Sequence, residues 1–345
     1  MEEKKLYQLL LRLTVWIKVL ALGIIGSGLL LLAYSLGIYR IEPQQVSGTA
    51  LSTARTVPVS TGSVWQPPLL ASLPSNRDGD LIRYGHELIA HTAVYLGPKG
   101  KVMQISNGMN CQNCHLKAGT VPYGNNYGLV ASKYPAFRNR SGTVEGFEKR
   151  VNDCIERSLN GQPLNPESKE MKAMVAYMKW VGKDVKKEKE NQNEGFGLLE
   201  LPLPEQAADP VKGKTVYDAY CTRCHGENGE GVLAENGMEY TYPPLFGSKS
   251  YNKGAGLYRI SRFAAFVKAN MPYGVSYDTP FLSDEEAWNV AAYVNSMPRP
   301  EIDLSEDWPE LSKKPFDHPF GPYTDSFPEN QHKFGPFGPI VLANQ

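Results

Sequence analysis

The sequence predicts a mainly α-helical protein in which two similar helical domains follow a single N-terminal apolar segment. Three observations carry this prediction. An uncharged apolar run covers Val19 to Tyr39. A Cys-x-x-Cys-His motif occurs twice, and each copy is followed by a helically periodic stretch that contains Ala-Tyr, at Tyr177 and at Tyr293. Self-similarity of this kind indicates an internal duplication of a small helical unit.

The charge balance limits the classes of partner. The chain has 345 residues, with 36 Lys+Arg and 36 Asp+Glu. A formal net charge of zero gives no reason to expect nucleic acid or a strongly charged partner surface. An anionic substrate would therefore need a locally basic pocket. The hydrophobic fraction of 41% and the charged fraction of 21% are typical of a folded globular protein.

The N-terminal apolar run is long enough to cross a bilayer as one helix. Basic residues precede it, which favours a cytoplasmic N-terminus and an exported remainder: Lys4, Lys5, Arg12 and Lys18. A cleaved signal peptide is the alternative, but its apolar core spans about 7–15 residues and ends at a small-residue cleavage site. We therefore predict an uncleaved transmembrane helix, with the rest of the chain on the periplasmic side of a bacterial inner membrane.

Composition divides the chain into six parts. We predict a membrane anchor at 1–40, a Ser, Thr, Pro and Gly-rich tether at 41–79, a first helical domain at 80–182, a charged linker at 183–208, a second helical domain at 209–300, and a tail at 301–345. The tail is rich in Pro, Gly and aromatic residues, and we expect it to wrap over both domains.

Capping signals predict where the closing helix of each domain begins. Asn165 followed by Pro166 predicts the start of the first closing helix, since proline favours the first helical position. Ser283 and Glu286 form a capping-box pattern, which predicts the start of the second.

The two Cys-x-x-Cys-His motifs are Cys111, Cys114 and His115, and Cys221, Cys224 and His225. This pattern is typical of covalent c-type haem attachment, in which both thiols bind the porphyrin and the histidine binds the iron. A zinc half-site or a redox dithiol could use a bare Cys-x-x-Cys pair. The adjacent histidine in both copies favours two covalently bound haem c groups. The predicted fold is thus two cytochrome c-like (class I type) helical domains in tandem, with His115 and His225 as proximal ligands.

The second axial ligands are predicted from position. Met271 precedes the closing helix of the second domain, as a distal methionine usually does, and Met238 is its rival. Cys154 stands nearly as far before Tyr177 as Met271 stands before Tyr293. A thiolate at this position would lower the potential of the first haem. A buried structural thiol and a disulfide partner are the alternative interpretations.

The surroundings of Cys154 suit an oxyanion. Residues 143–159 predict a helix with Thr143 as its N-cap, on which Arg150, Cys154, Arg157 and Ser158 share one side. Arg138 and Arg140 lie just before it. Guanidinium groups match tetrahedral oxyanions in geometry and charge. The alternative is that these arginines are solvated surface charges or partners of haem propionates.

These residues resemble the thiosulfate dehydrogenase / tetrathionate reductase family, dihaem c-type cytochromes that couple two thiosulfates to tetrathionate or run the reverse. The resemblance rests on Asn110 to Thr120, Val151 to Gly161, Pro243 to Gly247, Tyr251 to Gly256 and Asn270 to Pro272. It implies that His115 and Cys154 bind the active-site iron and that His225 and Met271 bind an electron-transfer iron. It also implies that Arg140, Arg150 and Ser158 act on substrate with Cys154.

The resemblance further implies that the protein acts on thiosulfate and tetrathionate. It also implies a redox partner in the periplasm or membrane, either a small cytochrome or a quinol-linked carrier. Asn270 stands where some members of the family carry a lysine that exchanges with the methionine ligand, so we expect permanent His/Met ligation here. A membrane-tethered electron-transfer cytochrome without catalysis of its own is the competing hypothesis. A dihaem peroxidase is a third, and it would need an open iron position.

Overall fold

The structure is a computed structural model that describes residues 12–22, 24, 64–186 and 195–344. The chain separates into two compact units, Met1–Val59 and Ser60–Gln345. Residues 12–22 and 24 of the first unit are helical. Most of the predicted membrane span, Val19 to Tyr39, lies outside the described residues. Within the described part of the chain, no helix has both the length and the apolar character needed to cross a membrane.

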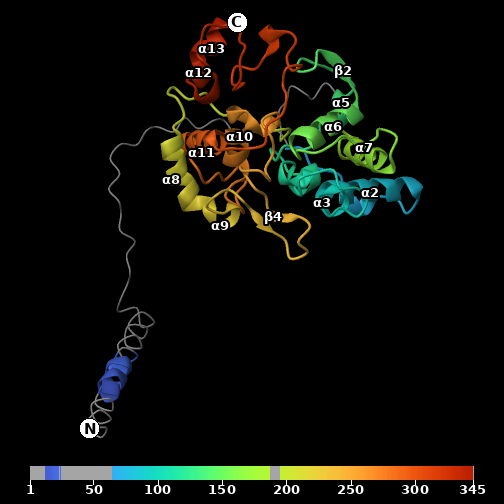
Figure 1. The fold of residues 1–345 in the computed structure, drawn as a ribbon. Coiled ribbons are helices and arrows are strands. Elements are labelled where there is room, and N and C mark those ends of the chain that lie inside the picture. The colour runs from blue at the N-terminus through green and yellow to red at the C-terminus, as the bar shows by residue number, and fades with distance from the viewer. Residues whose placement is uncertain (1–11, 23, 25–63, 187–194, 345) are drawn as a thin grey trace. The chain divides into compact units, whose positions relative to one another are not determined.

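The second unit is mainly helical, as predicted, with two short antiparallel hairpins (Figure 1). Its first half contains η1 (Leu70–Ser72), α2 (Arg77–Ala90), α3 (Thr92–Leu96), η2 (Cys111–Asn113), α4 (Leu116–Gly119), α5 (Val130–Lys133), β1 (Ala136–Arg138), β2 (Thr143–Glu145), α6 (Phe147–Arg157) and α7 (Lys169–Val181). Its second half contains α8 (Pro210–Tyr220), α9 (Thr222–His225), β3 (Val232–Leu233), β4 (Tyr240–Tyr242), η4 (Gly256–Tyr258), α10 (Ile260–Asn270), α11 (Asp284–Ser296), η5 (Leu311–Lys313), α12 (Glu329–Phe334) and α13 (Gly338–Ala343).

Two hydrophobic cores organise this unit. In the first core, α2 packs along α7, and α6 adds its apolar side. In the second core, α11 packs against both α8 and α10, and these three helices cluster together in Figure 1. Both cores bury bulky side chains completely, among them Met171 and Met174 in the first and Tyr217 in the second. Removing this apolar surface from water is the main force that stabilises each core.

The same helix crossing recurs in both cores. A Cβ on Gly85 of α2 would lie 2.0 Å from the carbonyl oxygen of Ala173 and 2.8 Å from Cβ of Tyr177. A Cβ on Gly213 of α8 would lie 1.9 Å from the carbonyl oxygen of Asn289 and 2.9 Å from Cβ of Tyr293. Glycine thus allows the entering helix to reach the closing helix at the tyrosine of each Ala-Tyr. This repeated contact supports the predicted duplication.

The capping signals were right for one closing helix and wrong for the other. Ser283 Oγ accepts the N–H of Glu286 at 3.2 Å, and the Glu286 carboxylate accepts the N–H of Ser283 at 2.8 Å, so α11 begins with the predicted capping box. The helix predicted to begin at Asn165 begins at Lys169, where Ser168 is the N-cap. Asn165 Oδ1 instead accepts the N–H of Glu167 at 2.9 Å and closes a turn before the helix.

The helix that carries Cys154 is shorter than predicted. Thr143 is not its N-cap, because Thr143–Glu145 forms β2 and pairs with Ala136–Arg138. The helix begins at Phe147 after Gly146. Strand pairing between residues separated along the chain overrode the local capping signal at Thr143.

The tail packs into the second core and also contacts the first half of the unit. Ile340 of α13 and Phe337 just before it are completely buried in the second core, and Phe334 of α12 packs against that core. Earlier in the tail, the N–H of Trp308 donates to the carbonyl of Arg140 at 2.7 Å. The predicted boundaries between domains, tether and linker remain predictions.

Candidate active site

The helix α6 places an arginine and a thiol side by side. Phe147, Val151 and Ile155 are buried and hold one side of α6 against the first core. The neighbouring side presents Arg150 and Cys154, one turn apart. Nη1 of Arg150 donates to Sγ of Cys154 at 3.1 Å. The charge of Cys154 raises the pKa of Arg150 above its ordinary value, so the guanidinium beside the sulfur stays protonated.

The first Cys-x-x-Cys-His motif lies within electrostatic reach of Cys154. Burial raises the pKa of the Cys111 thiol to about 11, and the charge of Cys154 contributes to that rise. Burial likewise raises the pKa of the Cys114 thiol to about 12, again with a contribution from Cys154. The fold therefore brings the unpaired thiol to the attachment motif, as a distal position requires.

His115 is oriented for metal binding. Its Nδ1 lies 2.5 Å from the carbonyl oxygen of Asn125, and the ring of Tyr127 stacks on the imidazole with centroids 4.6 Å apart. The pKa of His115 is lowered to about 4, mainly by burial and to a smaller extent by the charges of Arg150 and Arg262. A neutral imidazole that donates Nδ1–H to a carbonyl keeps Nε2 free for a metal.

The second motif has the same arrangement. Nδ1 of His225 lies 2.8 Å from the carbonyl oxygen of Pro243, and burial lowers the pKa of His225. Cys221 and Met271 both pack against the second core. All five cysteines are free. Paired thiols next to a histidine with a free Nε2 are the donor set that c-type haem needs, and both motifs supply it.

The rival methionine, Met238, lies in a segment that contacts the first half of the unit. Its neighbour Glu239 accepts from Asn110 Nδ2 at 2.9 Å, and a carboxylate oxygen of Glu239 lies 3.0 Å from Nδ1 of His91. Lys99 Nζ donates to the carbonyl of Gly237 at 3.3 Å. This segment joins the two halves, whereas Met271 packs against the second core. Met271 and Cys221 thus pack against the same core.

Two of the predicted arginines are held by the protein itself. Arg157 donates to both carboxylate oxygens of Asp307 at 2.8 Å. Arg140 donates to the carbonyl of Gly254 at 3.0 Å, its Nε lies 3.9 Å from Asp307, and its guanidinium lies 5.6 Å from the centre of the Trp308 ring. Sequence reasoning missed Asp307 and Trp308, because nothing local in the tail points to them.

Another cation within electrostatic reach of His115 and Arg150 comes from the second half of the chain. Arg262 lies on α10, and burial lowers its pKa to about 10. Repulsion by Arg259, Arg150 and Arg138 adds to that effect. Arg259 is balanced by Asp317, to which its Nε donates at 2.7 Å. Arg262 and Arg150 thus carry positive charge toward the first histidine, and sequence reasoning missed Arg262 because it is remote along the chain.

The motifs on which the resemblance rests contact one another. Asn252 Nδ2 donates to the carbonyl of Glu156 at 2.8 Å and to Oδ1 of Asn160 at 2.9 Å. The N–H of Asn252 donates to the carbonyl of Arg157 at 3.0 Å. Ser158 is the C-cap of α6, and its N–H donates to the carbonyl of Cys154 at 2.8 Å. The loop from the second half thereby fixes the end of the helix that carries the thiol.

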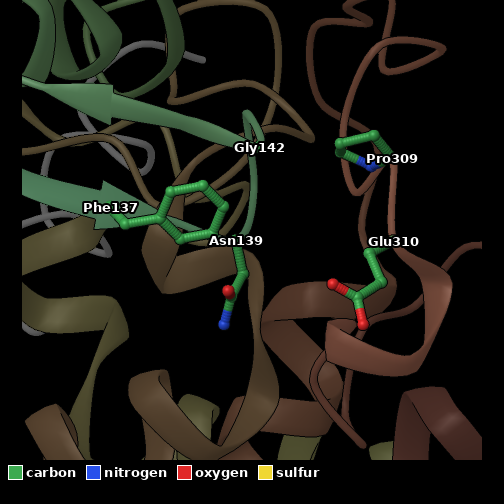
Figure 2. Close-up of a pocket in the computed structure, with 5 residues that line it drawn as sticks. All are labelled: Phe137, Asn139, Gly142, Pro309 and Glu310. Atoms are coloured by element: carbon green, nitrogen blue, oxygen red, sulfur yellow. The ribbon is translucent and has the colours of Figure 1, made fainter.

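A pocket of about 280 Å³ lies beside this region. Figure 2 shows its lining: Phe137, Asn139 and Gly142 from the β1–β2 hairpin face Pro309 and Glu310 from the tail. Gly142 allows a close approach, since a Cβ there would lie 2.7 Å from Cγ of Pro309. The pocket has a carboxylate and no basic lining residue, so it does not suit a small dianion.

Two family models match the chain. The model described as SoxA/TsdA, cytochrome c domain, matches residues 101–186, and the model described as cytochrome c matches residues 210–298. These ranges contain the first and the second Cys-x-x-Cys-His motif.

Curated relatives span most of both halves. The chain is 38% identical over 243 residues to a thiosulfate dehydrogenase of Stutzerimonas stutzeri, which covers 69% of this chain and 74% of the relative. It is 36% identical to a thiosulfate dehydrogenase of Thiomonas intermedia, and this alignment covers 70% of this chain and 74% of the relative. The solved thiosulfate dehydrogenase (TsdBA) from Marichromatium purpuratum, in its as-isolated form, superposes with a TM-score of 0.63 at 32% identity. That alignment covers 70% of this chain and 51% of the solved chain, so this chain spans about half of its length.

Proposed function

Because the chain belongs to the thiosulfate dehydrogenase family, we propose that it is a dihaem c-type cytochrome that oxidises thiosulfate. The cofactors are two covalently bound c-type haems, attached through the thiols of the two Cys-x-x-Cys-His motifs. The observation that carries the proposal is the Arg150–Cys154 pair beside the first motif. The reaction site is at this motif, and the second motif serves electron transfer.

The reaction joins two thiosulfate dianions through their terminal sulfurs. One S–S bond forms, two electrons leave, and tetrathionate is the product; reduction of tetrathionate is the reverse. No proton is consumed or released, so the protein has no need of a general base. Bound haem supplies one-electron acceptance. The chain must instead overcome repulsion between two dianions, which guanidinium groups do well at short range.

The arginines near Cys154 suit this task. Arg150 holds Cys154 by a hydrogen bond and faces the same space, while Arg262 adds charge from α10. Arg140 and Ser158 complete the proposed site, Arg140 from the β1–β2 turn and Ser158 from the end of α6. Their roles toward substrate are proposals supported by position.

The proposed iron ligands are His115 and Cys154 at the first haem, and His225 and Met271 at the second. Thiolate ligation lowers a haem potential, and methionine ligation raises it. Electrons would therefore flow from the first haem to the second. We also propose that the second unit lies on the periplasmic side of a membrane and delivers electrons to a small cytochrome or a quinol-linked carrier.

The experiment uses the full-length, haem-loaded protein. Thiosulfate with ferricyanide tests oxidation, and tetrathionate with a reduced dye tests the reverse. We expect turnover with thiosulfate, and Cys154→Ala should lower it by at least about 100-fold. The control Arg77→Met alters an exposed arginine at the start of α2 and should leave turnover unchanged.

Electron paramagnetic resonance of the oxidised protein tests the ligand directly. A thiolate signal should be present in the wild type and absent from Cys154→Met, while the His/Met signal persists. Full haem loading with no turnover in either direction would contradict the proposed function. It would leave the competing hypothesis, an electron-transfer cytochrome.

A further inference from the structure

Arg299 is a buried cation without an anion among the described residues. It follows α11 and is only 7% exposed. Its Nη2 donates to the carbonyl of Val294 at 2.7 Å. Its Nε and Nη1 are buried and have no hydrogen-bond acceptor in the described part of the chain. A buried guanidinium loses its hydration, so leaving two of its nitrogens unpaired is costly.

Two tyrosines flank this guanidinium. Its central carbon lies 4.3 Å from the centre of the Tyr251 ring and 4.7 Å from the centre of the Tyr258 ring. Ring faces attract a cation and so position Arg299, and a side-chain interaction of the Tyr251 hydroxyl with Arg299 partly offsets the rise that burial gives the pKa of Tyr251. Arg299 forms no ion pair among the described residues, and Glu301, two positions along the chain, pairs with Lys253. The site therefore calls for an anion that the described polypeptide does not supply.

The haem-attachment motifs pack against the same core as the two tyrosines. Tyr251 and Tyr258 belong to the second core, and Cys114, Cys221 and Met271 pack against that core. Burial raises the pKa of Tyr251, and Cys114 contributes to the rise, so the site also lies within electrostatic reach of the first motif. A c-type haem carries two propionate carboxylates. Carboxylate–guanidinium hydrogen bonds are among the strongest in proteins.

We propose that Arg299 binds a propionate carboxylate of the haem attached at Cys221 and Cys224. The second core supplies both flanking tyrosines and packs against the Cys221 and Met271 side chains, which favours its own haem, while Cys114 brings the first motif to the same core. A propionate of the first haem offers the same chemistry, and the experiment separates the two. This contact involves the cofactor and goes beyond thiosulfate oxidation.

The consequence is a raised potential at the second haem. A fixed cation beside a haem disfavours the ferric state, which carries one more positive charge than the ferrous state. Arg299 would therefore help the second haem to accept electrons. Burial by Tyr251 and Tyr258 strengthens this effect, because water screens it less.

The test compares Arg299→Met and Arg299→Lys with Arg77→Met in the haem-loaded full chain. The measurements are the midpoint potential of each haem by spectroelectrochemistry and the propionate bending modes by resonance Raman spectroscopy. For Arg299→Met we expect a lower potential of the His/Met haem and a shifted propionate mode. Arg299→Lys keeps the charge but loses the planar guanidinium, so it should shift the Raman mode with a smaller change in potential.

The outcomes are distinct. A shift confined to the first haem would overturn the assignment to the second haem and place the same carboxylate contact at the first. Unchanged potentials and Raman modes in both Arg299 variants would overturn the proposal. If Arg299→Met binds no haem, Arg299→Lys alone decides through the propionate mode. None of these measurements uses thiosulfate, so the result stands whether or not the chain oxidises it.

Discussion

Arg150 and Cys154 form a hydrogen-bonded pair, with Nη1 3.1 Å from Sγ, on the side of α6 that lies beside the first haem-attachment motif. The pair combines a soft sulfur ligand with a fixed positive charge. Helical spacing alone allows residues four apart to meet. The buried anchors Phe147, Val151 and Ile155 decide which space they face.

Replacing Arg150 tests the electrostatic part of the site. Arg150→Met should lower kcat/KM for thiosulfate by roughly 10–100-fold, because a hydrogen bond to a charged group contributes about 1.5–3 kcal/mol. Arg150→Lys should recover part of that loss, since it keeps the charge. Steady-state kinetics with ferricyanide measure both. Equal kcat/KM in wild type and Arg150→Met, at equal haem content, would show that this guanidinium plays no part in turnover.

Breaking the Arg157–Asp307 pair tests how the tail is attached. Their side chains are 16% and 9% exposed, so Asp307→Asn leaves a largely buried cation without its partner. We expect a loss of about 3–5 kcal/mol in the free energy of unfolding. Denaturant unfolding measures it. Glu285→Gln is the control, because its ion pair with Lys212 is exposed and should barely alter the midpoint. Similar midpoints for both variants would refute a structural role for Asp307.

His318 should make the stability depend on pH. Burial lowers its pKa from 6.5 to about 4, and the charge of Lys314 adds to this. The unfolded chain then binds more protons between these pH values, so stability falls as the pH drops from 6.5 to 4 and is constant above that window as far as His318 is concerned. The loss reaches up to about 3 kcal/mol. Unfolding of wild type and His318→Gln across this range should show the wild type losing more stability. Parallel curves would contradict the prediction.

Adding one methyl group at the second helix crossing should destabilise that core. Gly213→Ala places a Cβ within 1.9 Å of the Asn289 carbonyl, which forces α8 away from α11. We expect a loss of about 1–3 kcal/mol or more, and a lower haem content at the second motif. Gly256→Ala is the matched control, since a Cβ on Gly256 would have no other atom within 4 Å among the described residues. Thermal unfolding and haem absorbance distinguish the two. Equal effects would mean that the contact is not tight in solution.

Most of the local chemistry was predictable from the chain. Both attachment motifs, the capping box at Ser283 and the special position of Cys154 depend on residue type and short spacing. The start of α7 was predicted wrongly, and Thr143–Glu145, predicted to begin a helix, forms a strand. A turn closed by Asn165 and a pairing with Ala136–Arg138 competed with the capping signals there. Short-range patterns cannot tell whether such a residue caps a helix or forms a turn or strand, because the same residue types favour both structures.

Contacts between residues far apart in the sequence determine which charged groups surround the Cys154 thiol and how they are paired. Arg157 shares a side of α6 with Arg150 and Cys154, but Asp307, far away in the tail, holds it through two hydrogen bonds. Arg262 and Arg299 come from the second half of the chain, and no spacing rule connects either of them with Cys154 or Cys114. Motif spacing and helical periodicity depend on residues a few positions apart, so both can be predicted from the order of amino acids. Neutralisation of a buried charge depends on which distant groups packing brings within a few ångströms, and the folded arrangement alone determines that.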